Sequence, residues 1–270
     1  MNINRHTQEE LCFYSDMQNM TGKGVNPVMF HSLVKDKNLR VIRKMIQQKV
    51  DLNQPGISGY TPLMIASLTG NTEGVRLLIS NGADVNMTQK DGQTALWLAA
   101  FNGGSEIVSC LAKEGADLNK FDNQKKQTPL MIASDFGYLD TVRALIKAGA
   151  DVNFVSPYGQ TALSYALIGQ SRNMDIVKKL VHSGADIHSC PKSDNERVHT
   201  LPPLVLSVLH RNPQGVKFLL SKGADGLDMA LRFAESKLDV EMQKLLKKSV
   251  KISSSRNNIC NKIVNMREKE

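Results

Sequence analysis

The sequence has few aromatic residues and no long apolar run. Phe, Trp and Tyr together make up 5% of the 270 residues, so a core has to be built from aliphatic side chains. The longest nearly apolar stretch, residues 201–209, is far shorter than the roughly 20 residues of a membrane-spanning helix. The first residues are polar and lack the apolar segment of a secretory signal. We therefore expect no membrane span and a cytoplasmic location, with the nucleus or a host-cell cytosol as alternatives.

Cysteine is also scarce, and the four cysteines are far apart in the chain. No C-x-x-C or other close pair occurs among Cys12, Cys110, Cys190 and Cys260. A disulfide framework is therefore not expected, and a reducing compartment is the default interpretation. Cys110 falls on an apolar position of a predicted helix, so we expect its thiol to be buried.

The sequence signatures of common enzyme classes are missing. There is no phosphate-binding G-x-x-x-x-G-K-[ST], no nucleophile elbow G-x-S-x-G and no zinc-binding H-E-x-x-H. The nearest candidate set of metal ligands is His182, His188, Cys190 and His199. These residue types suit zinc, but their spacings in the sequence match no compact site. We predict a non-catalytic protein with no cofactor and no metal.

The net charge of +8 is unevenly distributed. Residues 247–270 contain seven basic and two acidic residues, so this tail alone contributes +5. A groove for nucleic acid would need its positive charge within the folded part of the chain. The sequence therefore does not favour specific nucleic-acid binding.

What the sequence does contain is a short phrase repeated at a fixed stride. "TPLMIAS" occurs at residues 61–67 and again at 128–134, and "GQTAL" occurs at 92–96 and again at 159–163. The threonine that opens each T-[PA]-L phrase recurs at steps of 33, 34 and 33 residues. This stride indicates a repeat protein, in which each unit buries its apolar face only against its neighbours. The 67-residue identity suggests that a cassette of two repeats was duplicated.

The residue types within one period predict a helix, a tight turn, a second helix and a loop. Thr61 can accept a hydrogen bond from a free backbone N–H at the start of a helix, and Pro62 suits the first helical position. A second helix over residues 72–80 should end near Gly82, because glycine readily adopts the left-handed conformation. The turn formers Asp84 and Asn86 follow. The predicted fold class is therefore an all-α solenoid.

This pattern resembles the ankyrin repeat. The resemblance is carried by the T-P-L-x-x-A phrase, by the G-A-D-[VLI]-N phrase and by the mid-repeat glycines Gly70, Gly103 and Gly137. It implies helix-turn-helix units joined by short hairpin-like loops. The histidine that usually follows T-P-L is replaced in all four repeats, by Met64, Trp97, Met131 and Ser164. We expect this replacement to remove a hydrogen bond between adjacent repeats and to add apolar bulk.

The register predicts six to seven units. A polar segment with a short helix, residues 1–25, precedes the ankyrin-repeat domain, residues 26–250. A basic tail, residues 251–270, is expected to be disordered. Insertions lengthen the chain near residues 171–173 and between 188 and 201. The repeats are expected near 26–58, 59–91, 92–125, 126–158, 159–198 and 199–225, with a C-terminal cap at 226–250.

The resemblance implies a concave binding surface made by the exposed face of each first helix and by the loop tips. Several positions along one line of this surface are apolar, and a contiguous exposed apolar strip usually marks a contact site. The alternative is that individual side chains tuck under neighbouring repeats. The predicted partner-binding residues are Tyr60, Leu68, Thr69, Lys90, Gln93, Phe101, Asn102, Gln127, Asp135, Phe136, Tyr158, Gln160, Leu167 and Ile168.

We therefore expect a monomeric scaffold that binds another protein or peptide. The alternatives are an adaptor or substrate-recognition subunit of a larger regulatory system, and a bacterial effector that acts on host proteins. Trp97 is expected to pack between repeats. Alanine at both Phe101 and Phe136 is expected to weaken binding with little change in thermal stability.

Overall fold

The computed structural model describes residues 39–47, 49, 51–56, 59–188 and 201–248. This part of the chain is helical, and it contains no strand beyond an isolated bridge between Thr88 and Thr94. The predicted all-α class is therefore confirmed. The predicted N-terminal helix, the basic tail and the insertion before residue 201 lie outside the described residues.

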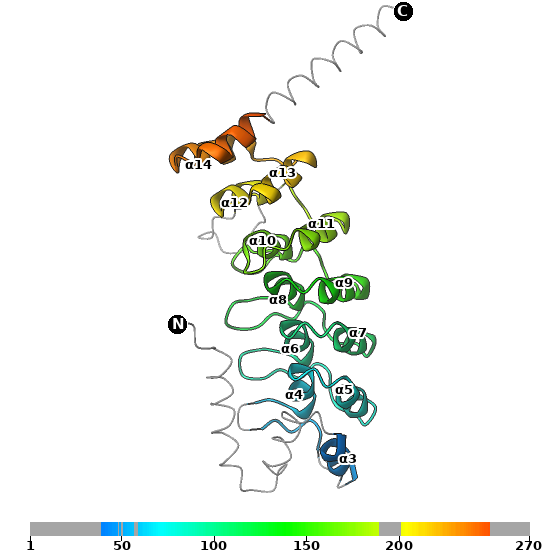
Figure 1. Ribbon diagram of the computed structural model, residues 1–270. Coiled ribbons are helices and arrows are strands. Elements are labelled where there is room, and N and C mark those ends of the chain that lie inside the picture. The colour runs from blue at the N-terminus through cyan, green and yellow to red at the C-terminus, as the bar shows by residue number, and fades with distance from the viewer. Residues whose placement is uncertain (1–38, 48, 50, 57–58, 189–200, 249–270) are drawn as a thin grey trace, which may run out of the picture.

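The helices form two columns that run along the molecule (Figure 1). The inner column consists of α4 (Pro62–Leu68), α6 (Ala95–Phe101), α8 (Pro129–Phe136), α10 (Ala162–Ile168) and α12 (Pro203–Leu209). The outer column consists of α3 (Leu39–Gln47), α5 (Thr72–Ile79), α7 (Ser105–Lys113), α9 (Leu139–Ala148), α11 (Met174–His182) and α13 (Pro213–Ser221). Two further helices, α14 (Leu227–Ser236) and a segment over residues 240–248, follow at the C-terminal end.

Neighbouring layers pack inner helix on inner helix and outer helix on outer helix. Helix α6 contacts α4 and α8, and α7 contacts α5 and α9. The same order continues upward, where α10 contacts α12 and α12 contacts α14. Each helix pair therefore shares its core with the pairs directly above and below it, as the repeat pattern predicts.

The threonine of each repeat begins an inner helix, as predicted. The Oγ1 atoms of Thr61, Thr94, Thr128 and Thr161 accept hydrogen bonds from the backbone N–H three residues on, at 3.1–3.3 Å. Pro62 and Pro129 occupy the first turn, where a missing backbone N–H costs nothing. The phrase T-[PA]-L thus fixes where each inner helix starts.

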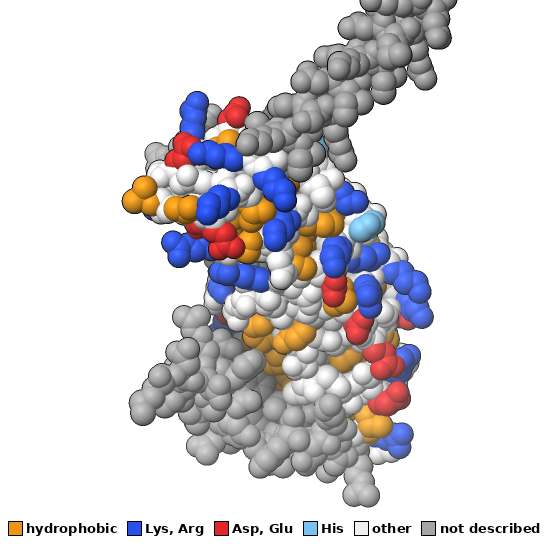
Figure 2. Space-filling model, turned by 45° about the horizontal axis from the view of Figure 1, so that its top comes forward, with side chains coloured by type: hydrophobic (Ala, Val, Ile, Leu, Met, Phe, Trp, Pro, Cys, Tyr) orange, Lys and Arg blue, Asp and Glu red, His pale blue; other side chains and the backbone are white. Residues whose placement is uncertain are grey.

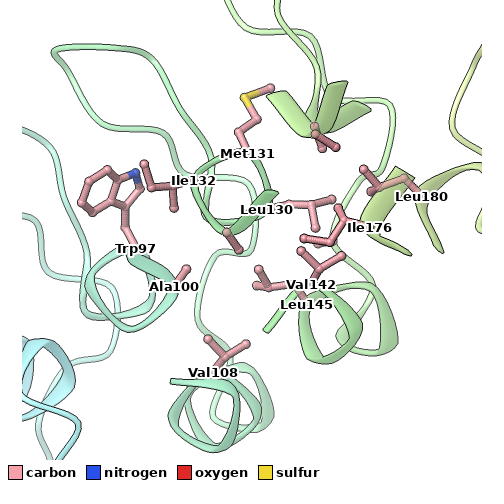
Figure 3. Close-up of a cluster of buried hydrophobic side chains, with 14 of the residues drawn as sticks. Trp97, Ala100, Val108, Leu130, Met131, Ile132, Val142, Leu145, Ile176 and Leu180 are labelled. Atoms are coloured by element: carbon pink, nitrogen blue, oxygen red, sulfur yellow. The ribbon is translucent and has the colours of Figure 1, made fainter. Parts of the chain in front are cut away.

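The core is aliphatic and continuous along the stack. The leucine that follows each cap is at most 1% exposed in the five inner helices. Figure 3 shows Leu130, Val142 and Ile176 turned toward one another between α8, α9 and α11. Fully burying one such side chain contributes about 1.5–3 kcal/mol. The scarcity of aromatic residues is compatible with this core because the helices are short and closely spaced.

The asparagine of the G-A-D-x-N phrase ties each repeat to the next. Its Oδ1 atom accepts from the backbone N–H of the aspartate one repeat later, at 2.7–3.0 Å. In three of the four cases its Nδ2 atom also donates to the glycine carbonyl of that repeat. We call this set the asparagine ladder: Asn53, Asn86, Asn119 and Asn153.

His188 stands at the next step of the asparagine ladder. Its Nδ1 atom lies 3.3 Å from Oδ2 of Asp225 in the following repeat. A side-chain contact therefore replaces the backbone contact at this step. The resulting link connects the same two layers through groups that are more than half exposed.

We predict that Asn86→Ala lowers the free energy of unfolding by about 1–2 kcal/mol, because two hydrogen bonds to the next repeat are lost. Chemical denaturation followed by circular dichroism measures this change. Asn102→Ala is the control, since Asn102 is exposed and its side chain makes no hydrogen bond in the described part of the chain. Equal losses in both variants would contradict the role of the ladder.

Candidate functional site

The inner and outer helices differ in charge. Asp135 is the one charged residue in the five inner helices. The outer helices carry the acidic and basic side chains, some of which pair between layers, as Arg76 does with Glu106 at 2.8 Å. In Figure 2 charged side chains gather along the right-hand edge and over the upper part of the view, while hydrophobic and uncharged side chains occupy much of the lower middle. We call the side formed by the inner helices and the loops between repeats the inner-helix face.

Four aromatic rings form a contact chain across two layers of this face. The rings of Trp97 and Phe101 stack with centroids 5.5 Å apart, and Phe101 meets Phe136 edge-on at 5.2 Å. Phe136 in turn stacks on Tyr138 at 6.0 Å. We call these four residues the aromatic cluster. Such ring pairs stabilise by about 0.5–1.5 kcal/mol beyond their burial.

Glycine and the turn geometry bring Tyr138 into the aromatic cluster. Gly103 ends α6 with a φ of +74°, and a Cβ added there would lie 3.0 Å from the Tyr138 ring. A larger residue at this position would therefore have to displace the ring. Tyr138 is 36% exposed, so the cluster has a buried end at Trp97 and a solvent-facing end at Tyr138.

Trp97 packs between repeats, as expected, but one prediction about it is wrong. Its indole Nε1–H donates a hydrogen bond of 2.9 Å to the carbonyl of Gln127 in the next repeat. The replaced histidine was expected to cost a hydrogen bond between repeats, and at this position the indole supplies one. Trp97 is 6% exposed, which places the donor in the interior, where an unsatisfied N–H would be costly.

The structure places the predicted partner-binding residues at three levels of exposure. Lys90, Asn102 and Tyr158 are exposed. Gln127, Asp135 and Leu167 are buried. The remaining residues are half-buried on the inner-helix face: Tyr60, Leu68, Thr69, Gln93, Phe101, Phe136, Gln160 and Ile168.

The prediction that Leu167 is exposed is wrong. Counted from the threonine cap, Leu167 lies at the position of Ser67, Ala100 and Ser134, all of which are buried. It points toward Gly215 of α13, where an added Cβ would lie 3.1 Å from the Leu167 side chain. Ile168 is therefore the residue of α10 that corresponds to Leu68 and Phe101.

The prediction that Gln127 is exposed is also wrong. The loop before it is closed by the buried carboxylate of Asp122, which accepts from the backbone N–H groups of Gln124, Lys125 and Gln127 at 2.7–3.0 Å. This closure folds the loop over Gln127, whose side chain is 1% exposed. The exposed tip of the loop is basic, and the ammonium group of Lys126 lies 5.5 Å from the centre of the Phe121 ring.

Asp135 was also placed on the exposed surface by the sequence pattern, and the structure corrects this. Its side chain is 8% exposed, and its Oδ1 atom accepts a hydrogen bond of 3.1 Å from the backbone N–H of Gln170. The loop after α10, lengthened by the insertion near residues 171–173, passes over the carboxylate. Tyr138 and Tyr165 are not among the residues predicted from the sequence, although both line this part of the face.

The titratable groups of the described part form no metal site. No group of three His, Cys, Asp or Glu side chains has a suitable arrangement there. Cys190 and His199 of the candidate metal-ligand set lie outside the described residues. Cys110 on α7 is half-buried rather than fully buried, and burial raises the pKa of its thiol while the nearby Arg76 opposes the shift.

These features define a helical repeat solenoid whose inner helices carry a single charged residue and a cluster of aromatic side chains. A comparison with protein-family models matches the ankyrin-repeat model of three copies to residues 13–89, 29–122, 76–156 and 120–190. The chain therefore belongs to the ankyrin-repeat family. Ankyrin repeats generally mediate protein–protein interaction and are typically non-catalytic. A comparison with curated proteins gives no significant match.

The length and composition of the helices also bear on whether they could span a membrane. Within the residues that the structure describes, none of the helices combines the length and the apolar composition needed to cross a membrane.

The packing of the aromatic cluster changes the expected effect of alanine at Phe101 and Phe136. Both rings are half-buried and contact other rings, so we predict that the double substitution lowers the free energy of unfolding by about 2–3 kcal/mol. Urea denaturation measures this loss. Tyr158→Ala is the matched control, because this ring is 48% exposed and should contribute less than about 0.5 kcal/mol. An unchanged stability of the double variant would show that the rings do not support the stack.

Proposed function

We propose that this chain is a non-catalytic scaffold that holds a partner protein on its inner-helix face, centred on the aromatic cluster. The observation that carries the proposal is the contrast between the two faces of the stack. The inner helices contribute one charged residue, Asp135, which is largely buried. The outer helices carry exposed ion pairs. Interface cores are depleted in charge and enriched in aromatic residues.

The aromatic cluster supports this proposal through its rigidity. Its rings contact one another and are anchored at Trp97, whose indole is hydrogen-bonded to the next repeat. A partner would therefore meet side chains that lose little conformational entropy on binding. Aromatic side chains held in this way commonly dominate the binding energy of an interface.

The backbone of the stack supports it as well. The asparagine ladder fixes each layer relative to the next, and the threonine caps fix where each inner helix begins, so the row of side chains keeps its spacing. The loop tips of neighbouring repeats also interlock, since the backbone N–H of Asn123 donates to the carbonyl of Asp91 at 2.6 Å. A preorganised surface of this kind binds without the cost of ordering loops.

We predict that arginine at both Thr69 and Asn102 reduces the recovery of a specific partner at least tenfold in an affinity capture read by quantitative mass spectrometry. The two new cations would lie beside the aromatic cluster and would have to be desolvated in an interface there. Ser80→Arg with Ala148→Arg is the matched control, because it adds the same charge at exposed positions of the outer helices.

A thermal scan establishes that both variants remain folded. The proposal is overturned if the inner-face variant captures the same partners as the unmodified chain. It is equally overturned if the outer-helix control loses those partners to the same extent.

A further inference from the structure

A depression of about 690 Å³ opens on the inner-helix face, beside the aromatic cluster and between α8 and α10. Its floor and walls come from the end of α8, from α10 and from the lengthened loop that follows α10. The lining residues are Asp135, Tyr165, Ile168, Gly169, Gln170 and Arg172.

The depression is built by contacts between the end of α8 and the loop after α10. The backbone N–H of Gln170 donates to Oδ1 of Asp135, and the backbone N–H of Ser171 donates to the Asp135 carbonyl at 3.2 Å. A Cβ on Gly169 would collide with the Asp135 carboxylate, and one on Gly137 would collide with Ser171. The lengthened loop can therefore pack on the end of α8 because Gly137 and Gly169 leave room for Ser171 and for the Asp135 carboxylate.

The first copy of the duplicated cassette lacks this arrangement. Directly after the shared phrase "TPLMIAS", Leu68 stands in the first copy where Asp135 stands in the second, and the turn after α6 carries no insertion at the place of residues 171–173. The depression therefore follows from the sequence differences between the two copies rather than from the general form of the repeat.

The charge on the floor of the depression is negative and incompletely satisfied. The bond from Gln170 is the one hydrogen bond that the Asp135 carboxylate accepts within the described part of the chain. An ionised carboxylate has room for several donors, and a largely buried one is stabilised most by a cationic donor. The Asp135 side chain is also fixed, because it is 8% exposed and bonded to the loop.

The wall of the depression suits a cation as well. Burial raises the pKa of the Tyr165 hydroxyl, the neighbouring Gln127 side chain opposes this shift, and the negative charge of Asp135 adds to it, so this ring stays neutral beside the carboxylate. The face of a tyrosine ring attracts a guanidinium or ammonium group. The side chain of Gln127, which lies near Tyr165, is buried and makes no hydrogen bond of ordinary geometry within the described residues.

Arg172 is the one positive charge at the rim. Its side chain is exposed and makes no ion pair in the described part of the chain. The Arg172 side chain can turn into solvent because it is exposed, whereas the Asp135 side chain is buried and bonded to the loop. The buried charge of Asp135 therefore has more influence on the choice of ligand than the exposed charge of Arg172.

We propose that this depression is a subsite for an arginine side chain of the bound partner, with the guanidinium group on Asp135 and against the Tyr165 ring. The proposal rests on the proposed protein-binding function and adds a partner chemistry to it. A guanidinium group fits because it is planar, donates in parallel to a carboxylate and stacks on aromatic rings. The partner would then combine an apolar segment over the aromatic cluster with an arginine one layer further along the stack.

The test uses N-acetyl-arginine methylamide as a probe, titrated into the full chain labelled with ¹⁵N. We expect saturable shifts of the amide signals of Gly169, Gln170 and Ser171, with millimolar affinity. N-acetyl-citrulline methylamide has nearly the same shape without the charge, and it should bind at least fivefold more weakly. Asp135→Asn keeps an oxygen acceptor for Gln170 and should weaken the arginine probe at least fivefold.

Arg172→Ala decides between a cation site and an anion site. If Asp135 selects the ligand, removal of the rim cation should leave the arginine probe bound as tightly or about two- to threefold more tightly. N-acetyl-glutamate methylamide should produce no saturable shifts. The proposal is overturned if the citrulline probe binds as well as the arginine probe, if the glutamate probe binds better, or if Asp135→Asn leaves the affinity unchanged while the variant is folded by its amide spectrum.

This experiment needs no partner protein, so the two proposals fail separately. Absence of probe binding would remove the arginine subsite and leave binding on the aromatic cluster intact. Loss of the scaffold function in the capture experiment would leave the measured affinity of the probe unchanged.

Discussion

Each helix pair of this protein completes the burial of its apolar side chains against the pairs above and below it. The leucines that follow the threonine caps are almost fully buried, and each inner helix contacts both its partner outer helix and the inner helices of the neighbouring layers. Every other feature depends on this stacking, because a layer shifted along the stack would separate ring from ring in the aromatic cluster. It would also pull Asp135 away from the loop of the next repeat.

Directional contacts then hold the stacked layers in register. The asparagine ladder joins loop to loop on the backbone, and the indole of Trp97 reaches the carbonyl of Gln127 from the inner column. Hydrophobic burial alone has no direction, whereas these bonds are satisfied in one register only. Since the outer helices carry most of the charged residues, the inner helices are left with a nearly uncharged row of side chains.

The two cassettes that share the phrase "TPLMIAS" carry different surfaces on that face. Leu68 of the first copy leaves an apolar position, while Asp135 of the second copy carries a charge beneath the lengthened loop. The aromatic cluster lies between these positions and belongs to both copies, because Trp97 and Phe101 come from the first and Phe136 and Tyr138 from the second. The inner-helix face thus carries an apolar surface and an adjoining charged depression.

The sequence by itself determined the helices, their caps and their order, because these depend on local residue chemistry that recurs at a fixed stride. It also located most of the inner-helix face, including Phe101, Phe136 and Ile168. The sequence pattern did not locate the burial of Gln127 and Asp135, which are covered by segments from other parts of the fold, whereas the burial of Leu167 follows from its distance to the Thr161 cap. The bond from Trp97 and the depression over Asp135 arise only when two repeats meet, since each joins groups about 30 or more residues apart that no local pattern brings together.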